Sequence, residues 1–468
     1  MEKGNRLVEL CRYLQDPHLV ARFQRFCGVR GTFSRTGTTA TGTGKESDRS
    51  RSHNNGACRR HIAGENDSGA SAVTGAGEGE KTQTGSPTRV RRRDDDDADA
   101  DANVATNRGE ESEPPPRNGA LVPGGETASA TAKPLRRNSL TGDAGREFLI
   151  GNRFLYYMFT FGTELGNELF YITFFPFVTW NVDAFVSRRL IMVWVWVMYL
   201  GQCTKDVVGW SRPASPPVVK VEMFYNSEYS MPSTHAMSGT ALPLSLLFLT
   251  YGRWEYPFTL GFSLALCWCL LVCVSRIYMG MHSVLDVIVG VLYSALILLF
   301  FLPALDLIDG FNVTCRCAPL VIVTLHLLLG FFSFNLDTWS TSRGDTAQIL
   351  GTGAGVALAS HVNRRLGLLP DAAPDQLPFA TPALGAGLVG SALLRLVLGV
   401  LVLMATRALM KAVTLPLVCR VFGVPGGDAR KARQHMEVEL PYRYIVYGAV
   451  GFNVLFLVPL LFSCARLS

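Results

Sequence analysis

From residue 154 to the end of the chain, long apolar runs alternate with short polar stretches. A helix needs about 20 apolar residues to cross a hydrocarbon core roughly 30 Å thick, and most of these runs approach that length. Backbone groups find no water to bind in lipid, so helices are expected rather than separate strands. We predict about nine membrane spans, centred on residues 154–180, 190–204, 236–251, 257–274, 287–304, 318–336, 349–360, 379–406 and 444–464.

The chain before these runs shows two different patterns. Leu7, Leu10 and Leu14 recur at helical spacing, so residues 1–29 are predicted to form an amphipathic segment. This segment either touches lipid or docks on the protein's own body. Residues 30–148 are rich in Gly, Ser, Thr, Ala and charge. We predict a disordered polar tail there, because such a composition buries too little apolar area to offset the ordering entropy.

The predicted fold is therefore all-α, a polytopic membrane helical bundle of about 8–10 spans. It occupies residues 149–468, and its catalytic core is expected at about residues 190–305. Of the 468 residues, 48% are apolar and only 18% are charged, whereas about a quarter are charged in ordinary soluble domains. The lipid bilayer is the expected partner. Nucleic acid is not, because the net charge is only +6 and the basic residues are scattered.

The eleven cysteines show no CxxC pairs, and most of them lie within apolar runs. A thiol in such a run usually packs as a small hydrophobic group. A disulfide framework or a zinc site is therefore not expected.

Polar residues concentrate in three short segments at the ends of the predicted spans, at residues 205–213, 231–235 and 275–286. No predicted span separates the first segment from the second, and the chain crosses the membrane twice between the second and the third. All three segments are therefore predicted to lie on one membrane face.

Several residues of these segments suit phosphate binding. Arg212 and Arg276 offer planar forks that match phosphate oxygens, and Lys205 adds a point charge. Together they would neutralise charge as magnesium does in other phosphoryl-transfer enzymes, so no metal or other cofactor is expected. Ser233 and the backbone amides of Ser233 and Thr234 stand at the start of a predicted helix, where N–H groups bind phosphate oxygens.

Three further residues suit covalent catalysis. His282 and Asp286 are four residues apart, so they share one face of a helix. A carboxylate that accepts from one ring nitrogen leaves the other unprotonated and nucleophilic. His282 is therefore the predicted nucleophile, forming a phosphohistidine, and His235 is the predicted acid for the leaving group and later the base for water. Each residue alone could be an ordinary interfacial side chain, but their joint spacing favours catalysis.

The patterns Lys-x6-Arg-Pro, Pro-Ser-x-His and Ser-Arg-x5-His-x3-Asp resemble the signature of the type 2 phosphatidic acid phosphatase superfamily. The middle pattern departs at Thr234, where glycine is usual. The neighbouring sequence is similar to the sphingosine-1-phosphate phosphatase branch, in which threonine is tolerated at that position. The residues that carry this closer similarity are 212–220, 224–235 and 275–282.

The resemblance implies a metal-independent, multi-pass phosphatase of the endoplasmic reticulum membrane. It implies conversion of sphingosine 1-phosphate and dihydrosphingosine 1-phosphate to free sphingoid bases. The residues alone leave other functions open, namely a phosphatase for phosphatidate or a polyprenyl diphosphate, or an inactive lipid-binding adaptor. Basic residues at 411–433 favour a cytosolic active site by the positive-inside rule, whereas the resemblance implies a lumenal one.

A sphingoid headgroup also carries an amine, which calls for a carboxylate near the phosphate site. Asp337 or Asp345, after the sixth predicted span, is the candidate, and the alternative is an ion pair with Arg343 in the same loop. Ser139 follows Arg-Arg-Asn and resembles a site for a basophilic kinase, so it is a candidate for regulatory phosphorylation.

Overall fold

The computed structural model describes residues 2–31, 148–222, 228–336, 342–368, 371–383 and 385–467. Within these ranges the chain is mainly helical, as predicted. Ser139, Asp337 and most of the predicted polar tail lie outside the described residues. In chain order the elements are α1 (Glu2–Gln15), α2 (Pro17–Phe26), β1 (Val29–Gly31), β2 (Phe148–Ile150), α3 (Arg153–Glu164), α4 (Glu168–Asn181), α5 (Ala184–Val208), α6 (Thr234–Thr250), α7 (Phe258–Tyr278), α8 (Val284–Thr314), α9 (Ala318–Leu336), α10 (Arg343–Leu366), the 3-10 turn η1 (Pro374–Gln376), α11 (Ala386–Phe422), α12 (Ala429–Ala432), α13 (Met436–Leu455) and α14 (Leu457–Cys464).

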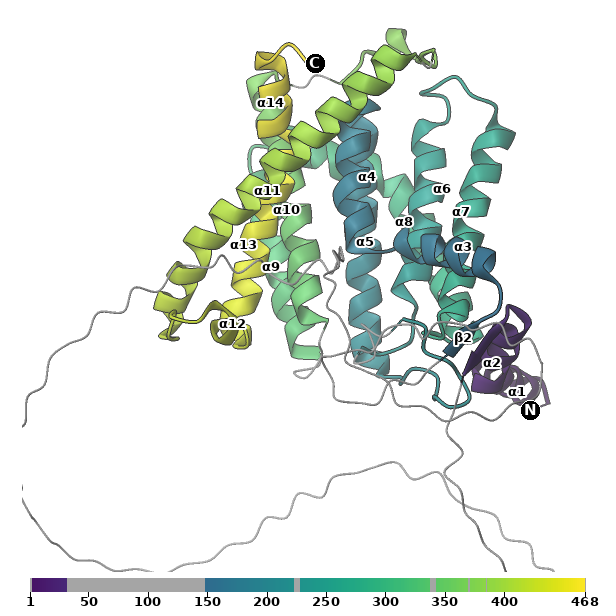
Figure 1. Ribbon diagram of the computed structural model, residues 1–468. Helices are drawn as coiled ribbons and strands as arrows, with labels where there is room; N and C mark the ends of the chain where they lie inside the picture. Colours follow the sequence, from purple (N-terminus) through teal and green to yellow (C-terminus); the bar gives the residue numbers. More distant parts are fainter. Residues whose placement is uncertain are drawn as a thin grey trace, which may run out of the picture. The chain divides into compact units, whose positions relative to one another are not determined.

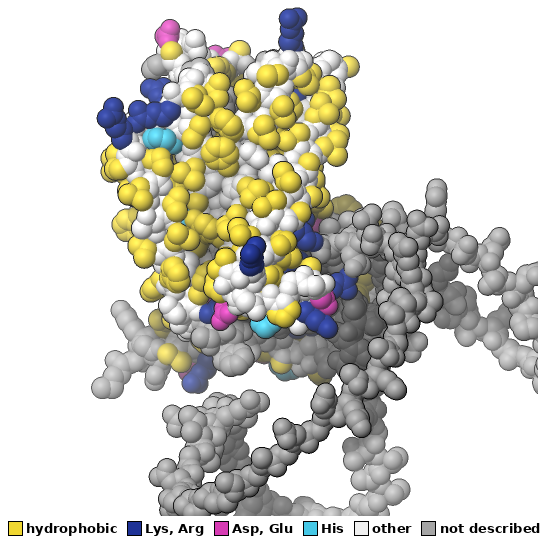
Figure 2. Space-filling model, turned by 90° about the vertical axis from the view of Figure 1, so that its left-hand side faces the viewer, with side chains coloured by type: hydrophobic (Ala, Val, Ile, Leu, Met, Phe, Trp, Pro, Cys, Tyr) yellow, Lys and Arg dark blue, Asp and Glu magenta, His cyan; other side chains and the backbone are white. Residues whose placement is uncertain are grey.

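The bundle has an apolar outer surface. Among the described residues, six helical stretches are long and apolar enough to cross a membrane: α5, α7, α8, α9, α11 and the α13–α14 pair. Figure 2 shows hydrophobic side chains over the middle of one face and Lys and Arg toward its two ends. The predicted spans at 236–251 and 349–360 correspond to α6 and α10, most of whose residues are buried by neighbouring helices. The chain is a multi-pass membrane protein.

Helix α5 lies at the centre of the bundle and contacts α4, α6, α8, α9 and α10. Its residues enter three hydrophobic clusters: one around Leu190 and Trp194, a second around Val193 and Val197, and a third around Tyr199 and Cys203. The second cluster also contains Met237 of α6, which begins at the predicted catalytic segments. The core therefore fixes the helices that carry those segments.

The predicted span at 154–180 is not one helix, which corrects the sequence-based boundary. It is divided into α3 and α4 by residues 165–167. Figure 1 shows α3 lying across the direction of α4. The Gly166 amide donates to the Thr163 carbonyl at 3.0 Å, and Asn167 precedes α4 in an extended conformation. This interruption matters for the site described below.

The N-terminal segment docks on the body of the protein through α2. The side-chain amide of Gln24, which is 1% exposed, donates to the carbonyls of Val219 (2.7 Å) and Tyr278 (2.9 Å) and accepts from the Val219 amide (2.9 Å). In contrast, α1 leaves Leu7 and Leu10 exposed. Gln24 thus joins the polar loop before α6 to the end of α7.

Two short strands at the ends of the predicted polar tail pair with each other, which the sequence analysis missed. Strands β1 and β2 are antiparallel, with Val29 opposite Ile150 and Gly31 opposite Phe148. Residues 30, 31 and 148 therefore belong to a small ribbon rather than to the predicted tail. The two described segments that flank residues 32–147 are therefore held together by this ribbon.

Candidate active site

The three predicted polar segments meet at one end of the bundle (Figure 1). Helices α5 and α7 end there, and α6 and α8 begin there. Gly209 and Gly280 adopt φ values of +62° and +72°, which let the chain turn sharply after α5 and α7. Ser233 is the N-cap of α6, and its amide donates to the Asp286 carbonyl at 3.2 Å, which ties the second segment to the third.

The three predicted phosphate-binding cations are buried and paired with carboxylates. Lys205 Nζ lies 3.1 Å from Glu228 Oε2, and Arg212 Nη2 lies 3.6 Å from the same oxygen. Arg276 Nη1 lies 2.8 Å from Glu222 Oε2. The side chains of the three cations are between 1% and 6% exposed. Sequence reasoning missed both glutamates, whose only signal was their place in the loop between the first two segments.

One donor of the cation cluster has no acceptor among the described residues. Arg276 Nε is buried without a hydrogen-bond partner there, although Nη1 of the same guanidinium is engaged by Glu222. An unpaired buried donor costs on the order of 1–3 kcal/mol. A phosphate oxygen placed beside Arg276 would remove that cost.

The two ring nitrogens of His282 face different partners. Nε2 lies 3.4 Å from Arg212 Nη1. A guanidinium has donors only, so this contact requires a lone pair on Nε2 and places the ring proton on Nδ1. Nδ1 lies 3.4 Å from Ser230 Oγ, which in turn donates to Asp286 Oδ2 at 2.6 Å. The predicted nucleophilic nitrogen therefore points toward the cation cluster.

Asp286 does not accept directly from His282, which differs from the prediction. Their Nδ1 and Oδ2 atoms are 3.9 Å apart, too far for a hydrogen bond. Asp286 Oδ2 instead accepts from Ser230 Oγ and from the Ser283 amide at 2.7 Å, while the Asp286 amide donates to Ser283 Oγ in a capping box. Ser230 is thus a site residue that the sequence analysis did not single out.

The environment of His282 keeps its imidazole neutral. Burial and then the charges of Arg212 and Arg276 hold the pKa of His282 well below 6.5. The side chain is 1% exposed. A neutral ring retains the lone pair that nucleophilic attack requires, so the electrostatics and the tautomer agree.

His235 lies at the start of α6 and contacts the interruption between α3 and α4. His235 Nε2 is 2.9 Å from Asn167 Oδ1, and the amide oxygen accepts the ring proton. A Cβ on Gly166 would lie 2.5 Å from Cδ2 of His235, so the ring fits only because residue 166 is glycine. Asn167 was also missed, although a Gly-Asn pair inside an apolar run was a signal that could have found it.

The residues predicted to bind phosphate at the start of α6 are partly engaged already. The Ser233 hydroxyl accepts from the Ala236 amide at 3.4 Å, and the Ser233 amide donates to the Asp286 backbone carbonyl. Thr234, which replaces the usual glycine, is 4% exposed. A Cβ on Gly201 of α5 would lie 3.1 Å from the Thr234 methyl group, so the absence of a side chain at Gly201 makes room for threonine.

Asp345, which was predicted to contact the substrate amine, forms an ion pair with Arg443. Asp345 Oδ1 lies 3.2 Å from Arg443 Nη1, and the Asp345 side chain is 46% exposed. Arg343, the alternative partner in the prediction, donates to the Phe334 carbonyl. Asp345 is close enough to Lys205 for a Coulombic interaction, but among the described residues it forms its ion pair with Arg443 and not with the cation cluster.

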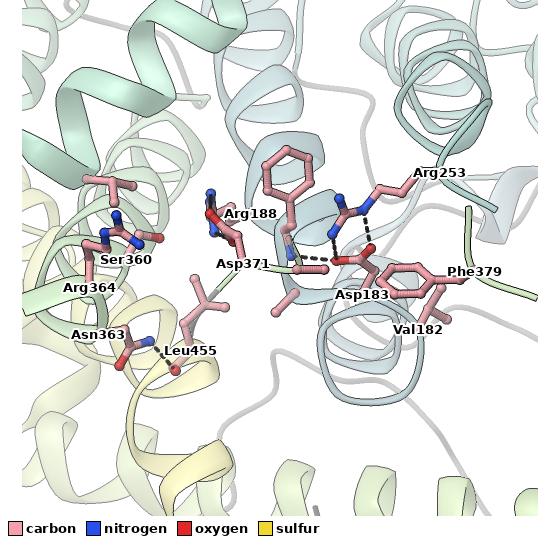
Figure 3. Close-up of a pocket in the computed structure, with 14 residues that line it drawn as sticks. Val182, Asp183, Arg188, Arg253, Ser360, Asn363, Arg364, Asp371, Phe379 and Leu455 are labelled. Carbon is pink, nitrogen blue, oxygen red and sulfur yellow. Dashed lines mark hydrogen bonds and ion pairs between the residues drawn. The ribbon is translucent and has the colours of Figure 1, made fainter. Parts of the chain in front are cut away.

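A second polar cluster surrounds a cavity of about 210 Å³ at the opposite end of α5 (Figure 3). Arg188 Nη1 lies 2.6 Å from Asp371 Oδ1, and Arg253 pairs with Asp183. None of the predicted catalytic or phosphate-binding residues lines this cavity. Its charges are mostly paired with each other, as expected of a structural ion-pair network.

The sequence of the chain is similar to those of several known proteins. Residues 174–307 match the family model described as PAP2 superfamily. The chain is 52% identical over 468 residues to sphingosine-1-phosphate phosphatase 1 of Rattus norvegicus, covering 100% of both chains. It is 38% identical over 362 residues to sphingosine-1-phosphate phosphatase 2 of Homo sapiens, covering 75% of this chain and 90% of that protein. It is 31% identical over 171 residues to lipid phosphate phosphatase delta of Arabidopsis thaliana, covering 35% and 41%. No solved structure matches the chain.

Proposed function

The chain belongs to the sphingosine-1-phosphate phosphatase family within the PAP2 superfamily, and from this premise we propose that it releases phosphate from sphingosine 1-phosphate and dihydrosphingosine 1-phosphate. The observation that carries the proposal is the contact of His282 Nε2 with Arg212 at 3.4 Å, inside a cluster of three buried cations. A phosphate held by that cluster lies against an unprotonated imidazole nitrogen.

Substrate binding uses the cations of the cluster. The phosphate oxygens accept from Lys205 and Arg212, and Arg276 Nε gains an acceptor, which it lacks among the described residues. Guanidinium groups bind such oxygens with two donors each, which orients the phosphate as well as neutralising it. No step requires a metal ion, because the cations supply the charge stabilisation.

The chemical step transfers the phosphoryl group to His282. Its Nε2 lone pair forms the bond to phosphorus, and the bond from phosphorus to the sphingoid oxygen breaks. The leaving oxygen keeps the electron pair of that bond and takes a proton from the imidazolium form of His235, whose Nε2 proton stays on Asn167 Oδ1. The ring of His282 then carries positive charge, and its Nδ1 proton is directed through Ser230 to the Asp286 carboxylate.

Water completes the reaction. His235, now deprotonated, accepts a proton from water as its oxygen attacks the phosphorus of the phosphohistidine. The bond from phosphorus to Nε2 breaks and returns the electron pair to the ring. Inorganic phosphate leaves, and both histidines recover their starting protonation.

The deciding experiment measures phosphate release by full-length protein in microsomes, with EDTA present. Wild type is expected to release phosphate from sphingosine 1-phosphate and dihydrosphingosine 1-phosphate, and H282A is expected to release none above background. In wild type quenched during turnover, labelled substrate is expected to leave an acid-labile, alkali-stable phosphoenzyme that is absent from H282A. Equal release by H282A would remove His282 as nucleophile, and a preference for phosphatidate or a polyprenyl diphosphate would overturn the substrate.

We place this activity in the endoplasmic reticulum membrane, as the family resemblance implies. The support in the chain is its multi-pass, apolar helical bundle. Co-localisation of an epitope-tagged full-length protein with an endoplasmic reticulum marker in cells is the expected result, and a plasma-membrane pattern would contradict it.

A further inference from the structure

Glu228 lies beside two of the three cations that are proposed to bind the substrate phosphate. Its Oε2 atom lies 3.1 Å from Lys205 Nζ and 3.6 Å from Arg212 Nη2, and the glutamate side chain is 13% exposed. The other terminal nitrogen of Arg212 lies 3.4 Å from His282 Nε2. A single guanidinium group therefore separates the Glu228 carboxylate from the nucleophilic nitrogen.

Binding of a phosphate changes what surrounds this carboxylate. Lys205 and Arg212 turn some of their donors to the phosphate oxygens, so Glu228 loses part of its positive surroundings while it remains largely buried. A buried carboxylate without a charged partner is costly. An ammonium group that arrives with the phosphate removes that cost.

A sphingoid phosphate brings such a group. Its amine is on the carbon next to the one that bears the phosphate ester, so the ammonium and the phosphate enter the site together. We propose that Glu228 binds the substrate ammonium and thereby selects sphingoid phosphates over lipid phosphates that have no amine. This inference rests on the proposed function and names a specificity residue for it.

Other carboxylates near the cluster fit this role less well. Glu222 contacts Arg276 Nη1, and Arg276 Nε, which has no partner in the described part of the chain, lets a phosphate bind without displacing Glu222. Asp286 is held by Ser230 and the Ser283 amide behind the nucleophile. Glu228 is the carboxylate that contacts two of the three cations among the described residues.

The test compares a substrate that has a charged amine with one whose amine is neutralised by acetylation. Sphingosine 1-phosphate and N-acetylsphingosine 1-phosphate are supplied to wild type, E228Q, E228D and E222Q in microsomes, and kcat/KM is measured for each. In E228Q, kcat/KM for sphingosine 1-phosphate is expected to fall about 10- to 100-fold, the range for a charge-assisted contact. Its kcat/KM for the N-acetyl substrate is expected to change little. E228D is expected to keep the preference, and E222Q to change both substrates by the same factor.

The outcomes separate this inference from the proposed function. Activity of E228Q on the N-acetyl substrate shows that the variant folds, so a selective loss supports Glu228 as the ammonium contact. If E228Q changes kcat/KM by the same factor for both substrates, Glu228 only competes with phosphate or supports the loop, and the inference is overturned. If wild type hydrolyses neither substrate, the proposed function itself fails and takes the inference with it.

Discussion

At the residue scale, the nucleophilic role proposed for His282 rests on contacts to both of its ring nitrogens. Arg212 selects the tautomer in which Nε2 carries the lone pair, and Ser230 holds the Nδ1 side. The carboxylate of Asp286 lies 3.9 Å from Nδ1, so it acts on the ring through Ser230 rather than by direct contact. The hydroxyl of Ser230 therefore belongs to the proposed catalytic machinery as a positioning group.

Removal of that hydroxyl gives a direct test. S230A leaves Nδ1 without an acceptor and Asp286 without one of its donors, so kcat is expected to fall about 10- to 100-fold. Phosphate release from sphingosine 1-phosphate at saturating substrate measures the change. S245A is the matched control, because Ser245 is equally buried in α6 but its hydroxyl has no hydrogen-bond partner in the described chain. A wild-type kcat in S230A would contradict the relay.

Lys220 gives the site a pH dependence on the alkaline side. Burial and then the charge of Arg212 lower the pKa of Lys220 from 10.5 to about 8. The side chain is charged below that pH and neutral above it, so the site loses a positive charge as pH rises through about 8. KM for N-acetylsphingosine 1-phosphate, which has no amine to titrate, is expected to rise over this range in wild type.

K220R supplies the control for this expectation. A guanidinium stays protonated throughout, so the rise in KM near pH 8 is expected to disappear in K220R. An identical pH profile in both proteins would assign the change to another group.

The residues that sequence reasoning found are those fixed by spacing, such as the His-x3-Asp pair. The residues that it missed are their partners. Glu228 and Ser230 lie in a loop whose path has no periodic pattern, and Asn167 meets His235 from 68 positions away. Contacts of this kind follow from tertiary packing rather than from local sequence.

At the element scale, the interruption between α3 and α4 serves the site. In a continuous helix over residues 154–180, Asn167 would have helical backbone angles, and its side chain would not be placed to contact His235 as it is here. The break instead lets the chain change direction at Gly166, beside the histidine ring. The apolar pattern predicted the helices. It did not predict the break, because the break accommodates the His235 side chain, which lies on a different helix.

Gly166 is therefore expected to tolerate no side chain. In G166A the new Cβ would lie 2.5 Å from His235 Cδ2, so the ring must shift and lose its alignment with the leaving group. We expect kcat to fall by at least about tenfold, with a destabilisation of about 1–3 kcal/mol from overpacking. Phosphate release and thermal unfolding in detergent measure the two effects. G310A in α8 is the matched control, because a Cβ there meets nothing within 4 Å, and it is expected to behave as wild type.

At the scale of the whole molecule, the proposed catalytic groups gather at one end of an apolar bundle. The phosphate of a membrane lipid lies at the bilayer surface, so this arrangement lets the reaction occur while the lipid chain stays in the membrane. Helix α8 starts at the site and has 31 residues. At about 1.5 Å per residue it is long enough to reach the opposite surface.

This geometry predicts that the N-terminus and Cys317 lie on opposite sides of the membrane. Cys317 is exposed between α8 and α9, at the end of α8 away from the site, whereas α2 docks beside the site through Gln24. In sealed microsomes, an N-terminal tag and Cys317 should differ in access to protease and to an impermeant maleimide.

The double variant C315S/C317S identifies the maleimide signal that belongs to this loop. Access to both probes from the same side would contradict the arrangement. The side on which the tag is cleaved also decides between the positive-inside expectation and the lumenal site implied by the family.

The ribbon of β1 and β2 has a consequence for how this chain is assembled from parts. Because Gly31 and Phe148 are paired neighbours, the two ends of the segment between them lie side by side. Lengthening such a closed connection costs little, about 0.6 kcal/mol for each doubling. We therefore expect changes of length between Gly31 and Phe148 to leave the folded N-terminal segment and the membrane bundle intact.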